Sequence, residues 1–321
     1  MMETGRRHGG EDGFNARSQP GGETPSSATL PPDHMPSPFD TDTFRLSMGL
    51  RALDPVDWTT IDAAYPALMA ERGRLLSERG RDVLDRLPGT EDVERELLAG
   101  LAHHLADRHP AHFARTPAGM QNRLTGATVA LDGDPLSAVN ALAPEDYCLL
   151  RRQEAGWVLA AAILCFPNRW RLRDKLGRPL PGVHAPVPGY DRALAGPVDR
   201  FLDGLRPGKG VWRTNWALND DAALFQPEET SHSDPRGDVT TENAGDRLFL
   251  RVERQTLVKL PESGAVAFGI RTYQRPIGEL SGEEARRFAA VLRSVPLDSA
   301  RYKGLHRTAA LALGVLELAT A

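Results

Sequence analysis

One histidine, His184, lies in a segment whose backbone is unusually restricted. Residues 178–190 read RPLPGVHAPVPGY, with four prolines and two glycines around the imidazole. Proline fixes φ and lacks an amide donor, so this segment cannot be a helix interior or a central strand. Such a loop holds a side chain in one direction at little entropy cost. The imidazole could therefore serve as a metal ligand; the alternative is a surface loop with an incidental histidine.

A second group of chemically capable residues lies in LFLRVERQTLVKL, residues 248–260. Arg254 shares a strand parity with four apolar residues, so we expect it to point to the apolar face, where a guanidinium needs an anionic partner. Glu253 has the opposite parity. A regular strand cannot direct both residues into one pocket, so one of them is structural unless a bulge re-aims it.

Arg271 belongs to the next strand-like segment, AVAFGIRTYQ, residues 265–274. Alanine, glycine and Tyr273 share its parity. Small side chains could leave space against the sheet for a flat ligand, and the alternative is an exposed face that carries small residues.

The elements that must position these residues follow from hydrophobic periodicity. The pattern predicts helices over 57–87, 91–106, 144–151, 191–205, 281–294 and 304–319, and strands over 128–131, 157–166, 211–218, 247–260 and 265–274. The continuous apolar run 157–166 has a buried helix segment as its alternative. Ser281 and Glu284 have the spacing of a capping box. Strands interrupted by a helical crossover predict an α+β fold, with an antiparallel sheet flanked by N- and C-terminal helices. This order is similar to that of the PAS fold, in which a ligand lies between the sheet and the helical segment after the second strand.

Two polar segments flank or interrupt this domain. Residues 1–42 are rich in Gly, Pro, Ser and charge, which predicts a disordered tail. Residues 43–321 are expected to form a single domain. Within it, residues 219–246 carry eight acidic residues and one arginine. This acidic insert could be a lid or a docking surface, but a disordered loop is the favoured interpretation.

Composition argues against several partners. The net charge is −4 and no basic stripe is visible, so no nucleic-acid partner is expected. Cys148 and Cys165 are the only cysteines; both lie in apolar runs, which predicts buried free thiols and a reducing, cytoplasmic location. No secretory signal is visible, and Glu317 interrupts the apolar end of the chain, so no membrane association is expected.

Motifs for other cofactors are also missing from the sequence. Neither GxGxxG nor GxxxxGK[ST] occurs, and two cysteines cannot hold an iron–sulfur cluster. Four histidines lie in HHLADRHPAH, residues 103–112, but no cysteine or carboxylate completes a zinc pattern. A helix terminus explains these histidines better than a metal site does.

Four segments carry a resemblance to a known family. CFPNRW, GRPLPGVHAPVPGY, VWRTNW and LFLRVERQTLVKLPESGAVAFGIRTYQRP resemble the heme-carrying, alpha-type subunit of the heme-dependent oxidative N-demethylases, and the similarity runs from about Phe44 to Leu297. The resemblance implies a PAS-like domain that binds heme b. It further implies removal of a methyl group from a small methylated amine, using O2 and electrons from a flavin/iron–sulfur reductase subunit, with release of formaldehyde. The alternatives are a non-catalytic heme or small-ligand sensor and a heme-free binding protein.

The resemblance also implies roles for the residues singled out above. His184 becomes the expected axial ligand of the heme iron. Arg254 and Arg271 become candidates for the heme propionates, and Arg169 could flank the pocket mouth. The alternatives are an ion pair with a local carboxylate for Arg254 and an exposed loop anchored by Trp170.

An amine substrate would need an acceptor for its ammonium group, or a group that lowers its pKa. Candidates for this catalytic role are Glu253, Asn215 and Tyr273, with Asp146 ranked below them.

Overall fold

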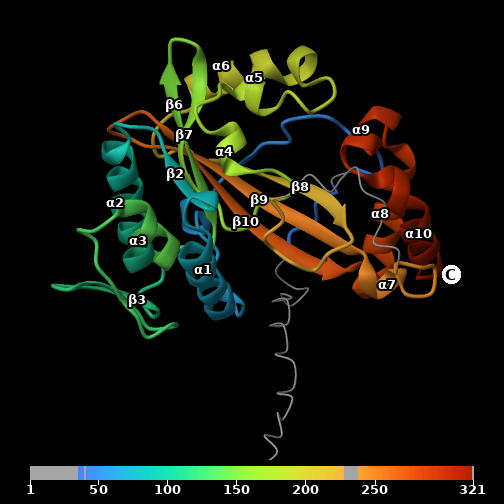
Figure 1. The fold of residues 1–321 in the computed structure, drawn as a ribbon, viewed down its shortest axis with the longest axis horizontal. Helices are drawn as coiled ribbons and strands as arrows, with labels where there is room; N and C mark the ends of the chain where they lie inside the picture. The colour runs from blue at the N-terminus through green and yellow to red at the C-terminus, as the bar shows by residue number, and fades with distance from the viewer. Residues whose placement is uncertain (1–34, 40, 228–237, 320–321) are drawn as a thin grey trace, which may run out of the picture.

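A seven-stranded antiparallel sheet forms the centre of the molecule (Figure 1). The computed structural model describes residues 35–39, 41–227 and 238–319. The strand order is β1-β8-β9-β10-β6-β7-β2, and β8, β9 and β10 pair without a register shift. The strands are β1 (Arg51–Ala52), β2 (Leu84–Arg86), β6 (Asp146–Gln153), β7 (Gly156–Ile163), β8 (Val211–Asn219), β9 (Phe249–Lys259) and β10 (Val266–Pro276).

Helices lie in three groups around this sheet (Figure 1). The first group is α1 (Tyr65–Arg79), α2 (Glu91–Arg108) and α3 (Pro135–Leu142), beside a small sheet of β3 (Phe113–Thr116), β4 (Gly119–Asn122) and β5 (Thr128–Val129). The crossover from β7 to β8 contains α4 (Leu172–Lys175), α5 (Leu180–Val183), the π-helical turn η4 (Asp191–Ala195) and α6 (Gly196–Gly204). The last group is α7 (Ala244–Arg247), α8 (Gly282–Ser294), α9 (Leu297–Tyr302) and α10 (Leu305–Leu318).

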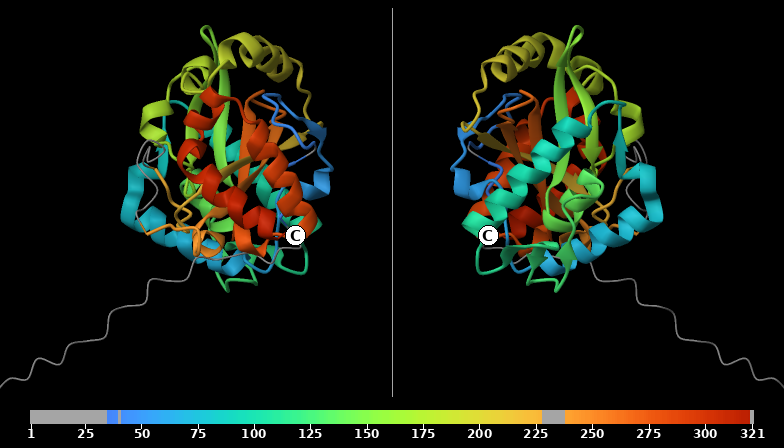
Figure 2. Two further views of the ribbon diagram at one scale, coloured as in Figure 1. Left: turned by 90° about the vertical axis from the view of Figure 1, so that its right-hand side faces the viewer. Right: turned by 90° about the vertical axis from the view of Figure 1, so that its left-hand side faces the viewer.

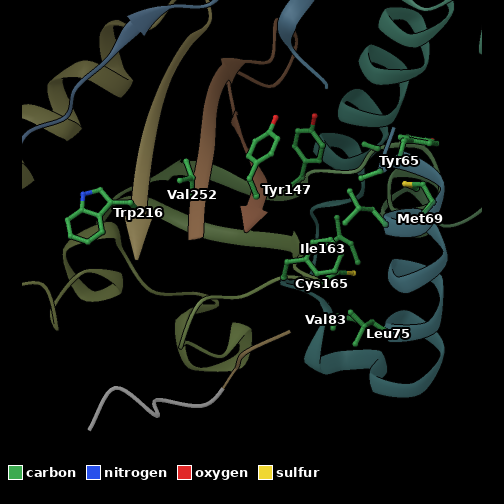
Figure 3. Close-up of a cluster of buried hydrophobic side chains, with 14 of the residues drawn as sticks. Tyr65, Met69, Leu75, Val83, Tyr147, Ile163, Cys165, Trp216 and Val252 are labelled. Atoms are coloured by element: carbon green, nitrogen blue, oxygen red, sulfur yellow. The ribbon is translucent and has the colours of Figure 1, made fainter. Parts of the chain in front are cut away.

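The sheet separates two hydrophobic clusters because successive side chains of a strand point to opposite faces. The larger cluster joins one face to helices α1–α3 and α8–α10 and includes Tyr147, Ile163 and Val252 (Figure 3). The smaller cluster joins the other face to the crossover helices and includes Leu159 and Leu202. Figure 2 shows α6 of the crossover, coloured yellow, above the sheet, and α8–α10 in orange to red beside it. The two faces of one sheet therefore have different neighbours.

Several sequence predictions are confirmed. The fold is α+β, with an antiparallel sheet, a helical crossover and flanking helices. Ser281 and Glu284 form the capping box at the start of α8. Both cysteines are buried and free. Among the described residues, no helix combines the length and apolar character needed to cross a membrane.

Three predicted elements are wrong in position or type. The sequence predicts a helix over 144–151, but strand β6 (Asp146–Gln153) occupies most of this range; apolar side chains on both of its faces hide the alternation of a strand. The strand predicted at 128–131 belongs to the small sheet instead of the central one. The helix predicted to span 57–87 begins only at Tyr65 and ends at Arg79, where Gly80 has a positive φ of 46°.

The two polar segments are more ordered at their edges than predicted. Phe39, inside the tail predicted to be disordered, is buried and stacks on Phe288 with ring centroids 5.1 Å apart. In the acidic insert, Ala244 is buried, and the Leu224 carbonyl accepts a hydrogen bond from Arg251. Residues 1–34, 40 and 228–237 lie outside the described residues, and so does that part of the disorder prediction.

Candidate functional site

A cavity of about 620 Å³ lies between the sheet and the β7–β8 crossover. This volume is in the range of sites that take cofactors or small molecules. Its floor is one face of the sheet, because Glu253 and Gln255 of β9 and Phe268 and Ile270 of β10 line it. These residues are register partners or near neighbours across the two strands. His184 and the helices around it form the opposite wall.

His184 is held by two contacts of its own segment. Its Nδ1 lies 2.9 Å from the carbonyl oxygen of Leu180. A carbonyl only accepts, so Nδ1 carries the proton and Nε2 keeps its lone pair. The imidazole stacks on Tyr190, with ring centroids 4.4 Å apart and an interplanar angle of 11°. Desolvation by burial lowers the pKa of His184, which keeps the ring in the neutral form that a metal requires.

The prolines around His184 act mainly through the helix that precedes it. Pro181 lies in the first turn of α5, where a missing amide hydrogen costs nothing. His184 then caps this single turn, and its amide donates to the Leu180 carbonyl. The segment is thus a short helix that ends at the imidazole, and not the fully irregular loop that its proline content suggests.

Glu253 provides the only carboxylate that lines the cavity within the described part of the chain. Its Oε2 accepts hydrogen bonds from Gln255 Nε2 at 2.8 Å and from Asn215 Nδ2 at 3.3 Å. Asn215 lies directly opposite Glu253 in the β8–β9 register. Both partners are neutral amides, so the negative charge of Glu253 remains available to a cationic ligand.

Five cationic side chains of the described residues line the cavity together with this carboxylate: Arg45, Arg169, Lys175, Arg213 and Lys303. Nε of Arg213 and Nε of Arg169 are buried and have no hydrogen-bond partner among the described residues. Arg169 has a long ion pair with Asp220 at 3.7 Å, whereas Arg213 has no ion pair among the described residues. Burial lowers the pKa of both guanidinium groups, and the attraction of Asp220 opposes this for Arg169. Unpaired buried donors of positive charge favour an anionic ligand at this part of the cavity.

Arg169 has the one positive φ, 61°, recorded for a non-glycine residue in the described chain. A long side chain adopts this conformation only when its surroundings enforce it. Here the Arg169 amide donates to the Gln226 carbonyl at 2.7 Å, and its guanidinium reaches the Lys303 carbonyl at 3.4 Å. The backbone strain therefore accompanies a side chain that is turned toward the cavity and toward α9.

Arg254 and Arg271 do not reach the cavity. They are register partners on the opposite face of β9 and β10. Arg271 makes an ion pair with Asp62 at 2.8 Å, and Arg254 donates to the Asp57 carbonyl at 2.6 Å. Among the described residues, Arg254 has no ion pair with the local carboxylate considered as its alternative partner, whereas Arg271, whose alternative was an exposed face, is buried and paired with Asp62. The propionate contacts expected for these two arginines are therefore not retained.

The small residues that share the face of Arg271 do not leave space for a flat ligand. A Cβ added at Gly269 would lie 2.6 Å from Thr256 Oγ1 and 3.1 Å from Tyr147 Cε1. The ring of Tyr147 fills this space. Tyr273 also points to this side and lies in the larger hydrophobic cluster, so it is not a residue of the cavity.

Asp146 has a structural role as well. Its Oδ1 accepts hydrogen bonds from Nη1 of Arg72 at 2.6 Å and from the Cys165 amide at 2.7 Å, and its Oδ2 accepts one from the Phe166 amide at 2.8 Å. This carboxylate is fully buried and its hydrogen-bonding capacity is used inside the protein.

Of the predicted site residues, the structure brings together His184, Glu253, Asn215 and Arg169 at one cavity. Sequence reasoning missed Arg213 and Lys303. Arg213 has the strand parity of Asn215, which could have identified it. Lys303 lies in the short connection between α9 and α10, where no local motif marks it. The one feature of the sequence that could have identified it is the scarcity of lysine.

The histidines of residues 103–112 do not assemble a metal site in the described residues. His104 and His109 contact each other edge to face, with ring centroids 5.7 Å apart, near the end of α2. Burial lowers the pKa of His104 to about 4.

A family model matches most of the chain. It is described as "haem-dependent oxidative N-demethylase, alpha subunit-like", and the match covers residues 49–313. The matched region contains every cavity residue discussed above, from Arg169 to Lys303. Its name points to a heme-dependent oxidoreductase of the N-demethylase type. The chain belongs to the family of haem-dependent oxidative N-demethylase alpha subunit-like proteins.

Proposed function

We propose that this chain binds heme b in the cavity and catalyses oxidative N-demethylation of a small methylated amine. The observation that carries the proposal is that His184 and Glu253 line one cavity from opposite walls. One wall provides a neutral imidazole whose Nε2 is not protonated, and the other provides a carboxylate held only by amides. These are the groups needed to hold a metal-containing cofactor and a cationic substrate.

The residues present fit heme. Nε2 of His184 would ligate the iron. Arg213 and Arg169 would face the propionates, and the buried Nε atoms of these two arginines have no hydrogen-bond partner in the described chain. Leu159, Phe268 and Ile270 supply apolar surface for a porphyrin ring. The strand order β7-β6-β10-β9-β8, with a helical crossover over the cavity, supports a PAS-like fold for this domain.

When bound, heme supplies the activation of O2. Overall, the methylated amine, O2, two electrons and two protons would give the demethylated amine, formaldehyde and one water. The chain has no nucleotide-binding motif or iron–sulfur ligand set of its own. We therefore propose that a flavin/iron–sulfur reductase subunit delivers the electrons.

Glu253 would accept a hydrogen bond from the substrate ammonium and take its proton, so that the amine nitrogen becomes neutral next to the methyl group. Asn215 and Gln255 orient the carboxylate, because both donate to the same oxygen, Oε2. Oε1 of Glu253 is then the atom that is left for the substrate.

Absorption spectroscopy of hemin-reconstituted protein tests the cofactor half of the proposal. Wild type is expected to give a Soret band that shifts when a methylated amine is added. His184→Ala is expected to lose or shift the ligated-heme band. An unchanged spectrum in that variant would exclude His184 as the axial ligand, and protein that takes up no hemin would support a heme-free binding protein.

Formaldehyde release tests the catalytic half. With O2 and a reductant, wild type is expected to produce formaldehyde from the methylated amine. Glu253→Gln keeps the shape and loses the charge, so we expect a rate loss of about 10²-fold or more, with hemin binding retained. Heme uptake without formaldehyde release in wild type would favour the sensor function.

A further inference from the structure

Lysine is rare in this protein. Only four of its 39 lysines and arginines are lysines, at positions 175, 209, 259 and 303. Everywhere else the chain uses arginine, whose guanidinium stays protonated in proteins. Lys303 is therefore notable, because a titratable amine lies beside two arginines at the proposed active-site cavity.

The surroundings of Lys303 compensate its charge poorly. Nζ donates to the Trp216 carbonyl at 2.7 Å and lies 4.6 Å from the centroid of the Trp216 ring. Within the described ranges, no carboxylate lies at ion-pair distance from it, and Glu253 acts on it only at longer range. The Arg213 guanidinium repels it. A partly buried lysine beside another cation is the usual environment of an activated amine nucleophile.

The protonation of Lys303 follows from this environment. Desolvation by burial lowers its pKa to about 8, against the attraction of Glu253. The Trp216 ring favours the charged form and works in the other direction. At a pKa of about 8, about one-tenth of the amine is neutral at pH 7, against less than about one-thousandth for an exposed lysine.

We propose that Lys303 is a covalent capture site for small aldehydes, a role that rests on the proposed demethylation for its natural ligand, formaldehyde. The lone pair of Nζ attacks the carbonyl carbon, the C–O π electrons move to oxygen, and proton transfer from nitrogen to oxygen gives a carbinolamine. Loss of water forms the imine. Both steps are reversible and need no oxidant or reductant, so the amine can hold the one-carbon product within the cavity and release it again.

Reductive methylation tests this site directly. The hemin-loaded protein is incubated at pH 7 with dilute formaldehyde and cyanoborohydride, which reduces the imine to a stable methylated lysine. Peptide mass spectrometry then gives the rate at each of the four lysines. Lys209 is exposed and serves as the internal reference, and Lys175 controls for access because it lines the same cavity.

We expect Lys303 to be methylated at least tenfold faster than Lys209 at pH 7. Its rate should level off above about pH 8, while that of Lys209 continues to rise. Lys303→Arg should abolish methylation at this position and leave the rates at the other three lysines unchanged. A rate at Lys303 equal to or below that of Lys209 would overturn the proposal, and so would a Lys303 rate that keeps rising through pH 9.

A turnover experiment separates this proposal from the proposed function. A ¹³C-methylated amine, O2 and a reductant replace the added formaldehyde, so that a ¹³C-methyl group on Lys303 reports formaldehyde made in the cavity. Added formaldehyde labels Lys303 with or without turnover. Fast labelling by added formaldehyde without any ¹³C-formaldehyde would refute the demethylation and still support the capture site. Formaldehyde release with slow labelling of Lys303 would refute the capture site alone.

Discussion

The two faces of the sheet at strands β8, β9 and β10 carry similar charged residues, which are paired on one face and unpaired on the other. On the face that packs against α1–α3, Arg271 and Asp62 form an ion pair, with exposed side-chain fractions of 0% and 3%. On the cavity face, Arg213 has no carboxylate partner within ion-pair distance among the described residues, and Glu253 is bound by neutral amides. The paired arginine serves the fold. The unpaired charges of Arg213 and Glu253 line the cavity, where a bound ligand could supply their missing partners.

The unsatisfied atoms on the two faces also differ in kind. On the packed face both acceptors and donors lack partners, including Oε2 of Glu145, the hydroxyl of Tyr147 and Nε of Arg271. Mixed donors and acceptors can be satisfied by buried water. In the charged side chains of the described residues that line the cavity, the buried atoms without a hydrogen-bond partner are donors, Nε of Arg169 and Nε of Arg213. Donors alone favour an anion.

The largest expected effect is the loss of the ion pair on the packed face. Arg271→Ala leaves Asp62 as an uncompensated buried charge and should lower the free energy of unfolding by about 3 to 5 kcal/mol. Denaturant unfolding of the apoprotein measures this change.

The matched control is Arg213→Ala, which removes an arginine that has no such partner. We expect a smaller loss of stability in the apoprotein, because Arg213 makes no contact ion pair among the described residues and Glu253, which attracts it at longer range, keeps its hydrogen bonds to Asn215 and Gln255. Equal losses in the two variants would contradict the division of the two faces into paired and unpaired charges.

Cofactor affinity should show the reverse order. Arg213→Met removes a charged donor from the cavity, and a hydrogen bond between charged groups contributes about 1.5 to 3 kcal/mol, so we expect hemin to bind about 10- to 150-fold more weakly. Titration of apoprotein with hemin measures the dissociation constant. Arg254→Met lies on the opposite face and should leave this constant unchanged once the fraction of folded protein is taken into account. If Arg254→Met weakened hemin binding more than Arg213→Met, the propionates would lie on the face of Arg254, and the proposed heme site would be wrong.

The sequence was sufficient for the strand parities on which this contrast rests. Alternation in β9 predicts that Glu253 and Arg254 point to different faces. β9 pairs with both neighbouring strands without a bulge, so the alternation is kept and the prediction is confirmed. Which face holds the cavity was not predictable. Arg254 shares a face with apolar residues, so the sequence favoured that face for the ligand. The face that holds the cavity is decided by which helices cover each side of the sheet. This depends on contacts between segments that are far apart in the sequence.

The same limit explains the other errors. Strand β6 has apolar residues on both faces, so its periodicity resembles that of a short buried helix. Lys303 lies 50 residues after Glu253 and 119 after His184, and its contact with Trp216 of β8 places it at the cavity. No local pattern encodes that contact.

The smallest expected effect concerns acid stability on the packed side. Burial, and then the neighbouring His109, lower the pKa of His104 to about 4, so the folded state holds this ring neutral. The unfolded chain binds a proton near pH 6.5, before the folded chain does. The stabilisation is therefore present above pH 6.5 and is lost as the pH falls toward 4.

His104→Phe should remove this part of the acid sensitivity. The ring contact with Trp58, with centroids 5.5 Å apart, can be kept by phenylalanine, and the buried Nε2 without a partner is removed. The free energy of unfolding, measured at pH 7 and pH 5, should fall less between the two values in the variant than in wild type. His306→Phe, at a histidine exposed on α10, is the control and should follow wild type. If the two variants lose equal stability on acidification, the buried histidine on the packed side does not contribute to acid unfolding, and the carboxylates must account for it.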